Sequence, residues 1–247
     1  MAAARLPSNL LSPCRRAYSI SHEHHHRLRE LLRETAQPVA VVTSLMPRSN
    51  ASDASDEPLY HGATLSSFTS ISLSPYPLVA FSLRVPSRMA TTLSHLSQPR
   101  TSSSSSDAAS LSNTHMVVNI LSAAQTHAAH LFSRTDLYPR PFDSSELSFS
   151  FTRDRLPILH GSLGALSCRV IGTAWPLSDL KALGGSELEG DDEAGDGVAS
   201  ELFIAKVVRV EDVPVETKED DPMRTLPLLY HRRGYGTIAP HSSFPKS

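Results

Sequence analysis

The sequence predicts a mainly β protein, folded as a small barrel or sandwich with a few short helices. Roughly six to seven segments have the length and the β-branched or alternating apolar pattern of strands, while three have helical periodicity. The helices do not alternate regularly with the strands, which argues against a doubly wound parallel sheet. No GxGxxG motif follows a predicted strand, so the sequence does not support a Rossmann dinucleotide site.

Three helices are expected from periodic apolar residues that have proline or serine near their ends. In the first, leucines form a stripe among charged residues, and Pro38 lies just beyond its end. The second follows Pro86 and Ser87, and serine favours a helix start. The expected helices span residues 24–36, 88–96 and 123–132.

The expected strands are apolar runs bounded by polar residues, glycine or proline. The first is rich in valine, which is typical of a buried strand. Residues 142–151 are interpreted as a loop with a short edge element, and residues 227–230 lead into a basic and aromatic tail. Strands are expected at residues 39–45, 59–72, 78–83, 116–121, 163–174 and 202–210.

The 247 residues provide enough chain for one large domain or two small ones. We interpret residues 22–240 as one domain interrupted by low-complexity polar insertions, and residues 241–247 as a tail. The insertions are expected near residues 47–58, 98–114 and 183–199.

Charge and hydropathy exclude several classes of protein. The net charge of −2 argues against a nucleic-acid-binding protein, which usually has a basic excess. No apolar run approaches the roughly 20 residues needed to span a bilayer. Two cysteines, Cys14 and Cys168, are too few for a disulfide framework and fit a reducing compartment.

The N-terminal residues 1–21 have the composition of a mitochondrial transit peptide. They are rich in alanine, serine and leucine and contain arginines, and the first acidic residue is Glu23. Residues 16–19 also resemble a matrix-protease signal, with cleavage after Tyr18. The pattern predicts a protein of the mitochondrial matrix; the alternative is a disordered basic tail on a cytosolic protein.

Three segments together have the residue types needed to hold a phosphorylated planar cofactor. The first is Thr64–Ser67, within the stretch from His61 to Leu83. Its small and hydroxyl side chains offer hydrogen bonds and let a flat ligand approach the backbone closely.

The second segment, Arg84–Met89, joins a strand to a helix. A helix N-terminus and two arginines favour a phosphate, although an ordinary capped helix with exposed arginines has the same pattern. The third segment, Leu229–Tyr235, offers an aromatic ring and an imidazole that can border a cofactor ring. Alternatively, Tyr230 is a core residue that closes the barrel and His231 lies on the surface.

The remaining histidines and cysteines do not predict a metal site or a nucleophile. A histidine cluster at residues 22–26 has no cysteine or carboxylate partners at zinc-site spacing. His127 and His130 are expected on a solvated helix face, and Cys168 is expected to be a small buried apolar residue. No GxSxG elbow is present.

The order of these segments resembles the flavin reductase-like family, and in particular a mitochondrial-type member of it. The resemblance covers about residues 28–238. It implies an FMN-binding split β-barrel of Greek-key type and a homodimer with FMN near the subunit interface. It also implies hydride transfer from NADH or NADPH to FMN, and then electron transfer to an acceptor such as a partner oxygenase. The matching segments are HGATLSSFTSISLSPYPLVAFSL, RVPSRMATTL, HMVVNILSAAQTHAAHLFS, LPILHGSLGALSCRVIGTAW, ELFIAKVVRV and LPLLYHRRGYGTI.

The same resemblance implies a set of cofactor-binding residues. One group would contact the flavin ring and ribityl chain, another would line the next strand, and a third would hold the phosphate, with further neighbours beside them. In that order they are Thr64, Leu65, Ser66 and Ser67; Ser82 and Leu83; Ser87, Arg88 and Met89; and Asn119, Tyr230 and His231.

Two residues depart from the family pattern. Ser66 stands where the family often has asparagine, and Ser200 stands where many members have a histidine near the reactive side of the flavin. The second departure predicts FMN binding with weakened nicotinamide oxidation. It leaves open a non-catalytic FMN-binding or assembly protein in mitochondria, whose insertions contact partners. A further alternative is a barrel of the pyridoxamine-phosphate oxidase type, which uses oxygen as acceptor.

Overall fold

The computed structural model describes residues 15–46, 59–97, 114–179, 199–214 and 221–239, with side chains from residue 23 onward. The predicted insertions and the C-terminal tail lie almost entirely outside these residues, as do the first 14 residues of the predicted transit peptide. The helices are α1 (Arg15–Arg33), α2 (Arg88–Ser97) and α3 (Thr126–Ser133), with 3-10 segments η2 (Ala123–Gln125), η3 (Pro141–Asp143) and η4 (Pro222–Arg224).

The strands form one large antiparallel sheet and two small ones. The large sheet has the order β3-β2-β6-β9-β11-β5-β4, with β10 paired to β11; β1, β12 and β13 form a second sheet, and β7 and β8 a third. The strands are β1 (Gln37–Pro38), β2 (Ala40–Leu45), β3 (Tyr60–Leu65), β4 (Thr69–Ser72), β5 (Leu78–Arg84), β6 (Met116–Ile120), β7 (Phe149–Phe151), β8 (Pro157–Leu159), β9 (Gly164–Val170), β10 (Trp175–Pro176), β11 (Ser200–Glu211), β12 (Leu229–His231) and β13 (Gly234–Gly236).

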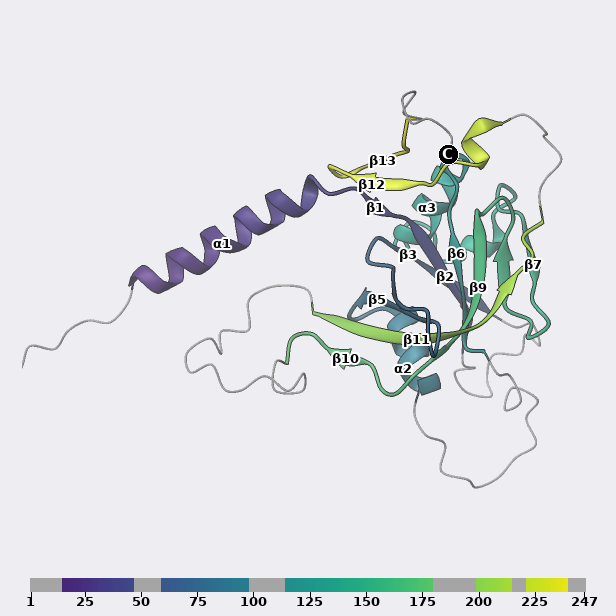
Figure 1. The fold of residues 1–247 in the computed structure, drawn as a ribbon, viewed down its shortest axis with the longest axis horizontal. Helices are drawn as coiled ribbons and strands as arrows, with labels where there is room; N and C mark the ends of the chain where they lie inside the picture. The colour runs from purple at the N-terminus through teal and green to yellow at the C-terminus, as the bar shows by residue number, and fades with distance from the viewer. Residues whose placement is uncertain (1–14, 47–58, 98–113, 180–198, 215–220, 240–247) are drawn as a thin grey trace, which may run out of the picture.

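The predicted fold class, a mainly β split barrel with few helices, is confirmed. The large sheet curls, and α2 and α3 lie against it (Figure 1). Two predicted strands were too long: residues 59–72 divide into β3 and β4, and the strand predicted at residues 163–174 ends at Val170 as β9, with the unpredicted two-residue strand β10 beginning at Trp175. The short strands β1, β8, β12 and β13 were not predicted, since two or three residues are too few to show a period.

Helix α1 extends away from the body of the molecule (Figure 1). It begins at Arg15, well before the predicted start at residue 24, so the predicted end of the transit peptide at residue 21 falls inside it. Its leucines Leu28, Leu31 and Leu32 are each at least half exposed. Among the described residues, no helix combines the length and apolarity needed to cross a membrane.

The main core fills the concave face of the large sheet. Alternate residues of β2, β5, β6, β9 and β11 point into it because side chains alternate across a strand. Helix α2 closes this core with Met89, Ala90 and Leu93. Phe81 and Phe203, which are opposite each other on β5 and β11, stack with ring centroids 5.7 Å apart.

A second core covers the other face of β2. Val39 and Val41 pack there with residues of α3, whereas Ala40 and Val42 belong to the main core. Strand β2 is therefore buried on both faces, which explains its valine-rich sequence.

Gly62 on β3 sets how closely α3 approaches the sheet. A Cβ atom at this position would lie 2.5 Å from Cδ1 of Phe132, a ring that is 1% exposed. The missing Cβ at residue 62 therefore gives room to the Phe132 ring.

Substituting Gly62 with alanine is expected to lower the free energy of unfolding by about 1–3 kcal/mol, because the buried Phe132 ring has to move. Urea unfolding measures this change. Gly164→Ala is the matched control, since a Cβ there meets no atom within 4 Å. An equal loss of stability in both variants would contradict the packing role of Gly62.

Candidate functional site

The structure brings the first predicted cofactor segment against the end of β5. The hydroxyl of Ser67 accepts a hydrogen bond from the Ser82 backbone N–H, with N and Oγ 2.9 Å apart. The same hydroxyl donates to the Ser82 carbonyl at 3.2 Å. Since Thr69 pairs with Ala80, these bonds continue the β4–β5 pairing by one further step through a side chain. Thr64–Ser67 and Ser82–Met89, which we call the predicted flavin site, therefore lie together.

Side chains in the predicted flavin site divide into exposed and buried ones. Ser66 is half-buried and Ser67 is exposed. Leu65, Leu83 and Met89 belong to the main core, so only their backbone groups can contact a ligand. The Thr64 hydroxyl donates to the carbonyl of Ala129 at 2.7 Å and so ties β3 to α3.

The predicted helix start at Ser87 is confirmed. Its hydroxyl accepts a hydrogen bond from the Ala90 N–H at 3.1 Å, as an N-cap residue does. The first-turn amides of Arg88 and Met89 have no acceptor within the helix, which is the rule for every helix start. Arg84 and Arg88 are both exposed. Amides, helix dipole and two guanidinium groups together favour a phosphate at this position.

The beginning of β11 forms the neighbouring side of the predicted flavin site. Ser200 is opposite Arg84 in the β5–β11 register. The Val85 N–H donates to the Ala199 carbonyl at 2.8 Å. Glu201 accepts a hydrogen bond from Ser94 of α2 at 3.1 Å and so connects strand and helix. The residue at the position of the family histidine therefore lies beside an arginine.

His61 is a buried titratable residue whose role was not predicted. It is 4% exposed and lies on β3, on the same face as Ala63 and Leu65. Burial, and then the positive charge of Arg88, lower the pKa of His61 to about 4, so its imidazole is neutral at pH 7. His61, Ala63 and Leu65 follow one another at a spacing of two residues, and this alternation was the available sequence signal for an inward side chain.

Asn119 links three strands inside the protein. Its Nδ2 donates to the Val41 carbonyl at 3.2 Å and to the Thr43 hydroxyl at 3.3 Å, and its Oδ1 accepts from the Leu159 N–H at 2.9 Å. The residue is fully buried. The structure therefore gives the Asn119 amide a structural role and does not place it at the predicted flavin site.

Tyr230 and His231 lie on the small β1-β12-β13 sheet. The ring of Tyr230 packs against Tyr235, which in turn contacts His130 of α3 at 4.8 Å between ring centroids. Strand β12 and helix α2 are well separated (Figure 1). Within one chain, the third predicted segment is therefore not brought to the second.

The other candidate groups are engaged elsewhere or inert. His127 is exposed and lies 3.1 Å from a Glu146 oxygen. Burial raises the pKa of the Cys168 thiol to about 12, which leaves it protonated and unreactive. In the part of the chain that the structure describes, no three His, Cys, Asp or Glu residues are grouped as metal ligands.

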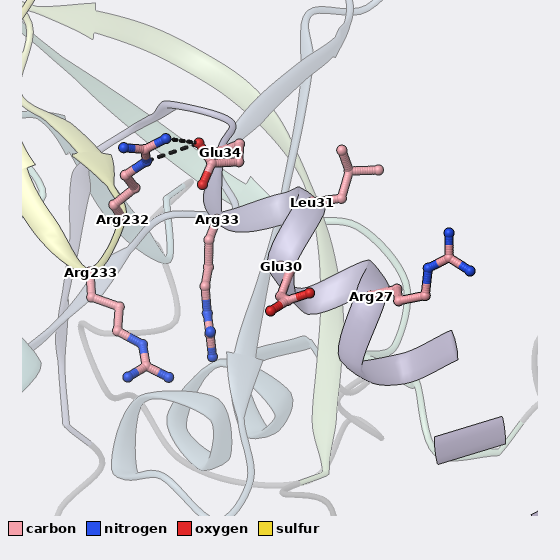
Figure 2. Close-up of a pocket in the computed structure, with 7 residues that line it drawn as sticks. All are labelled: Arg27, Glu30, Leu31, Arg33, Glu34, Arg232 and Arg233. Carbon is pink, nitrogen blue, oxygen red and sulfur yellow. Dashed lines mark hydrogen bonds and ion pairs between the residues drawn. The ribbon is translucent and has the colours of Figure 1, made fainter. Parts of the chain in front are cut away.

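A hollow of about 630 Å³ lies away from the predicted flavin site, between α1 and the β12–β13 turn (Figure 2). We call it the arginine groove. It is lined by Arg27, Glu30, Leu31, Arg33, Glu34, Arg232 and Arg233.

The sequence of residues 32–239 matches the model of the flavin reductase like domain family. The chain belongs to this family. The match spans the main sheet, the predicted flavin site and the β12–β13 hairpin, and it makes this flavin reductase-like protein a member of a family of flavin-binding oxidoreductases.

Solved structures share the fold of this flavin reductase-like protein. A nitrilotriacetate monooxygenase component B homolog from Mycobacterium thermoresistibile is 23% identical with a TM-score of 0.57, covering 92% of this chain and 93% of its own. The NADH:FAD oxidoreductase SgcE6 of Streptomyces globisporus, in complex with NAD and FAD fragments, is 19% identical with a TM-score of 0.56, at 90% and 96% coverage. The styrene monooxygenase flavin reductase of Pseudomonas putida S12 is 22% identical with a TM-score of 0.53, at 87% and 99% coverage.

The low pKa of His61 predicts a loss of stability in mild acid. Below pH 6.5 the unfolded chain binds a proton at this residue, and the folded protein does so only near pH 4. The stability is therefore complete above pH 6.5 and decreases as the pH falls toward 4. Between pH 7.5 and pH 5, His61 is expected to lower the free energy of unfolding by about 1–2 kcal/mol.

Urea unfolding at several pH values of the wild type and of His61→Asn measures this contribution. The variant is expected to show a smaller decrease, while the exposed control His231→Asn keeps the wild-type decrease. His115, whose pKa burial also lowers, is present in all three proteins and cancels. Identical decreases in wild type and His61→Asn would contradict the assignment.

Proposed function

We propose that this protein is an NAD(P)H-dependent flavin reductase that binds FMN at the predicted flavin site. The observation that carries the proposal is the double hydrogen bond between Ser67 and the backbone of Ser82. It holds the hydroxyl-rich segment against the strand that leads directly into the arginine-flanked start of α2. Groups that can bind a flat ring system therefore lie next to groups that can bind a phosphate.

The residues present fit FMN. The amides of Arg88 and Met89, with the guanidinium groups of Arg84 and Arg88, would hold the phosphate. The backbone of Thr64–Ser67 and the hydroxyl of Ser66 would face the flavin ring and ribityl chain. The hydroxyl of Ser67 is already used by Ser82, so its role is to shape this side of the site.

When bound, FMN would supply the hydride acceptor of the reaction. The chain's own contribution is binding and orientation. Its rigid frame is the β5–β11 pairing and the Ser87 cap, which fix the phosphate end. Because His61 is neutral at pH 7, it does not add a second positive charge near the Arg88 guanidinium. Ser200 offers a hydroxyl where a histidine is common in the family, and it cannot act as an acid or base near neutral pH.

We propose that the reduced flavin passes its electrons to a separate acceptor protein. Two structural relatives support this proposal: BorF is described as the flavin reductase component of a two-component tryptophan halogenase, and another is the reductase of styrene monooxygenase. We also propose that the protein is a homodimer in the mitochondrial matrix. The composition of residues 1–21 supports the location.

Binding of FMN and of riboflavin tests the phosphate site. Arg84→Gln and Arg88→Gln are each expected to weaken FMN binding by about tenfold or more, because charge-assisted bonds to the phosphate are lost. Riboflavin lacks the phosphate, so its affinity should remain unchanged. Flavin fluorescence quenching measures both, with FAD as a comparison and Arg153→Gln as an exposed-arginine control. Failure of the wild type to bind any flavin would overturn the proposal.

Replacement of Ser200 by histidine is expected to raise the kcat of NADH or NADPH oxidation by about tenfold or more, since an imidazole at this position can take part in acid–base chemistry. Stopped-flow absorbance at 340 nm measures the rate, and Ser178→His on an exposed turn is the control. If the wild type binds FMN and neither protein oxidises either nucleotide, the protein is the non-catalytic FMN-binding alternative.

A further inference from the structure

The lining of the arginine groove has more positively charged than negatively charged side chains. Four arginines and two glutamates line it. Arg33 and Arg233 point in the same direction in Figure 2, while Arg27 lies on the other side of the hollow. Among the described residues, no ion pair is found for these three arginines.

Arg232 is the fixed part of the groove. Its backbone N–H donates to the Arg33 carbonyl at 3.1 Å and so binds the C-terminal end of α1. Its guanidinium donates two hydrogen bonds to Glu34, one of them from Nε at 2.9 Å (Figure 2). These bonds use one glutamate and hold α1 against the β12–β13 turn. They fix the positions from which Arg33 and Arg233 extend.

The turn itself has an unusual sequence for its geometry. Arg232 and Arg233 have φ angles of +48° and +66°, so both lie in the left-handed region. A two-residue hairpin turn of this kind normally has Asn-Gly or another sequence with glycine, because a Cβ atom destabilises the left-handed conformation. Pairing with Glu34 explains Arg232. Within the described part of the chain, no ion pair or side-chain hydrogen bond is found for Arg233, whose side chain lines the groove while its backbone is strained.

We propose that the arginine groove binds the phosphate groups of a nucleotide-sized anion. One guanidinium group can donate two parallel hydrogen bonds to the oxygens of a phosphate. Residues with a strained backbone often lie at ligand sites. The volume of about 630 Å³ is in the range of small-molecule sites. Leu31, which is 64% exposed, is the apolar residue of the lining, and its side chain points away from those of Arg33 and Arg233 (Figure 2). This site is separate from the FMN phosphate position at α2 (Figure 1).

The attraction of a helix C-terminus for cations is an alternative explanation for part of the groove. It accounts for Arg33, which lies in the last turn of α1. It does not account for Arg233, which lies on another element and in a strained conformation. The two positive charges also repel each other, and a bound dianion would relieve this repulsion.

Isothermal titration calorimetry of the full-length protein with inorganic pyrophosphate and with ADP tests the proposal. FMN is kept in excess so that neither probe binds at the flavin phosphate position. Arg233→Gly and Arg33→Gln are each expected to weaken the binding of both probes by about tenfold or more. Because glycine tolerates the left-handed conformation, Arg233→Gly should also raise the Tm by about 2–4 °C.

Arg155→Gly is the matched control. Arg155 is also an exposed arginine with a positive φ, +58°, but it does not line the groove. This variant should gain stability in the same way and keep the wild-type affinity for both probes. The visible spectrum of each sample reports FMN binding separately, so a failure of the proposed flavin site and a failure of the groove are distinguishable.

Three results would overturn the proposal. The first is no binding of either probe at millimolar concentration. The second is binding that Arg233→Gly leaves unchanged, which would place the anion elsewhere. The third is saturable binding of poly-L-glutamate without binding of pyrophosphate, which would make the groove a surface for an acidic protein.

Discussion

Strand β11 connects the two halves of the large sheet, and the rest of the structure depends on this connection. Its residues from Ser200 to Lys206 pair with β5, and those from Ala205 onward pair with β9. A register shift between Val207 and Arg209 separates the two ends of the strand. Because a bulge bends a strand and increases its twist, this shift allows one strand to follow the curl of the sheet.

A buried polar network holds the second end of β11 in place. Arg209 contacts Asp154 at 2.6 Å and Glu211 at 2.9 Å, and Ser167 of β9 donates to Glu211. All three charged side chains are mostly buried. Loss of one member would leave a buried charge unpaired, which typically destabilises a protein by about 3–5 kcal/mol. The other end of β11 begins at Ser200, which lies opposite Arg84 and forms one side of the predicted flavin site.

The two cores give the site its rigidity from opposite faces of the sheet. In the main core, α2 is anchored by Met89 and Leu93, which fixes the position of its N-terminus. On the other face, Gly62 admits the Phe132 ring, and the Thr64 hydroxyl binds the carbonyl of Ala129. In β3, Gly62 and Thr64 therefore contact α3. By the proposed function, the backbone at the end of the same strand binds the flavin.

The sequence by itself determined the main elements of this protein and its family. Hydrophobic periodicity located α2, α3 and most strands of the large sheet, and Ser87 was identified as the N-cap from its position before a periodic segment. These features are local, since they depend on residues a few positions apart. The proposed phosphate position at α2 depends on such local features and was therefore accessible from the sequence.

Only the tertiary structure decided which distant residues meet. It joined Ser67 to Ser82, engaged Asn119 in three strands, and placed Tyr230 on a small sheet away from α2. It also brought Arg33 to Arg233 in a groove that neither segment predicts alone. The physical reason is that strand register and helix packing are set by long-range side-chain contacts, and no local pattern specifies the partner.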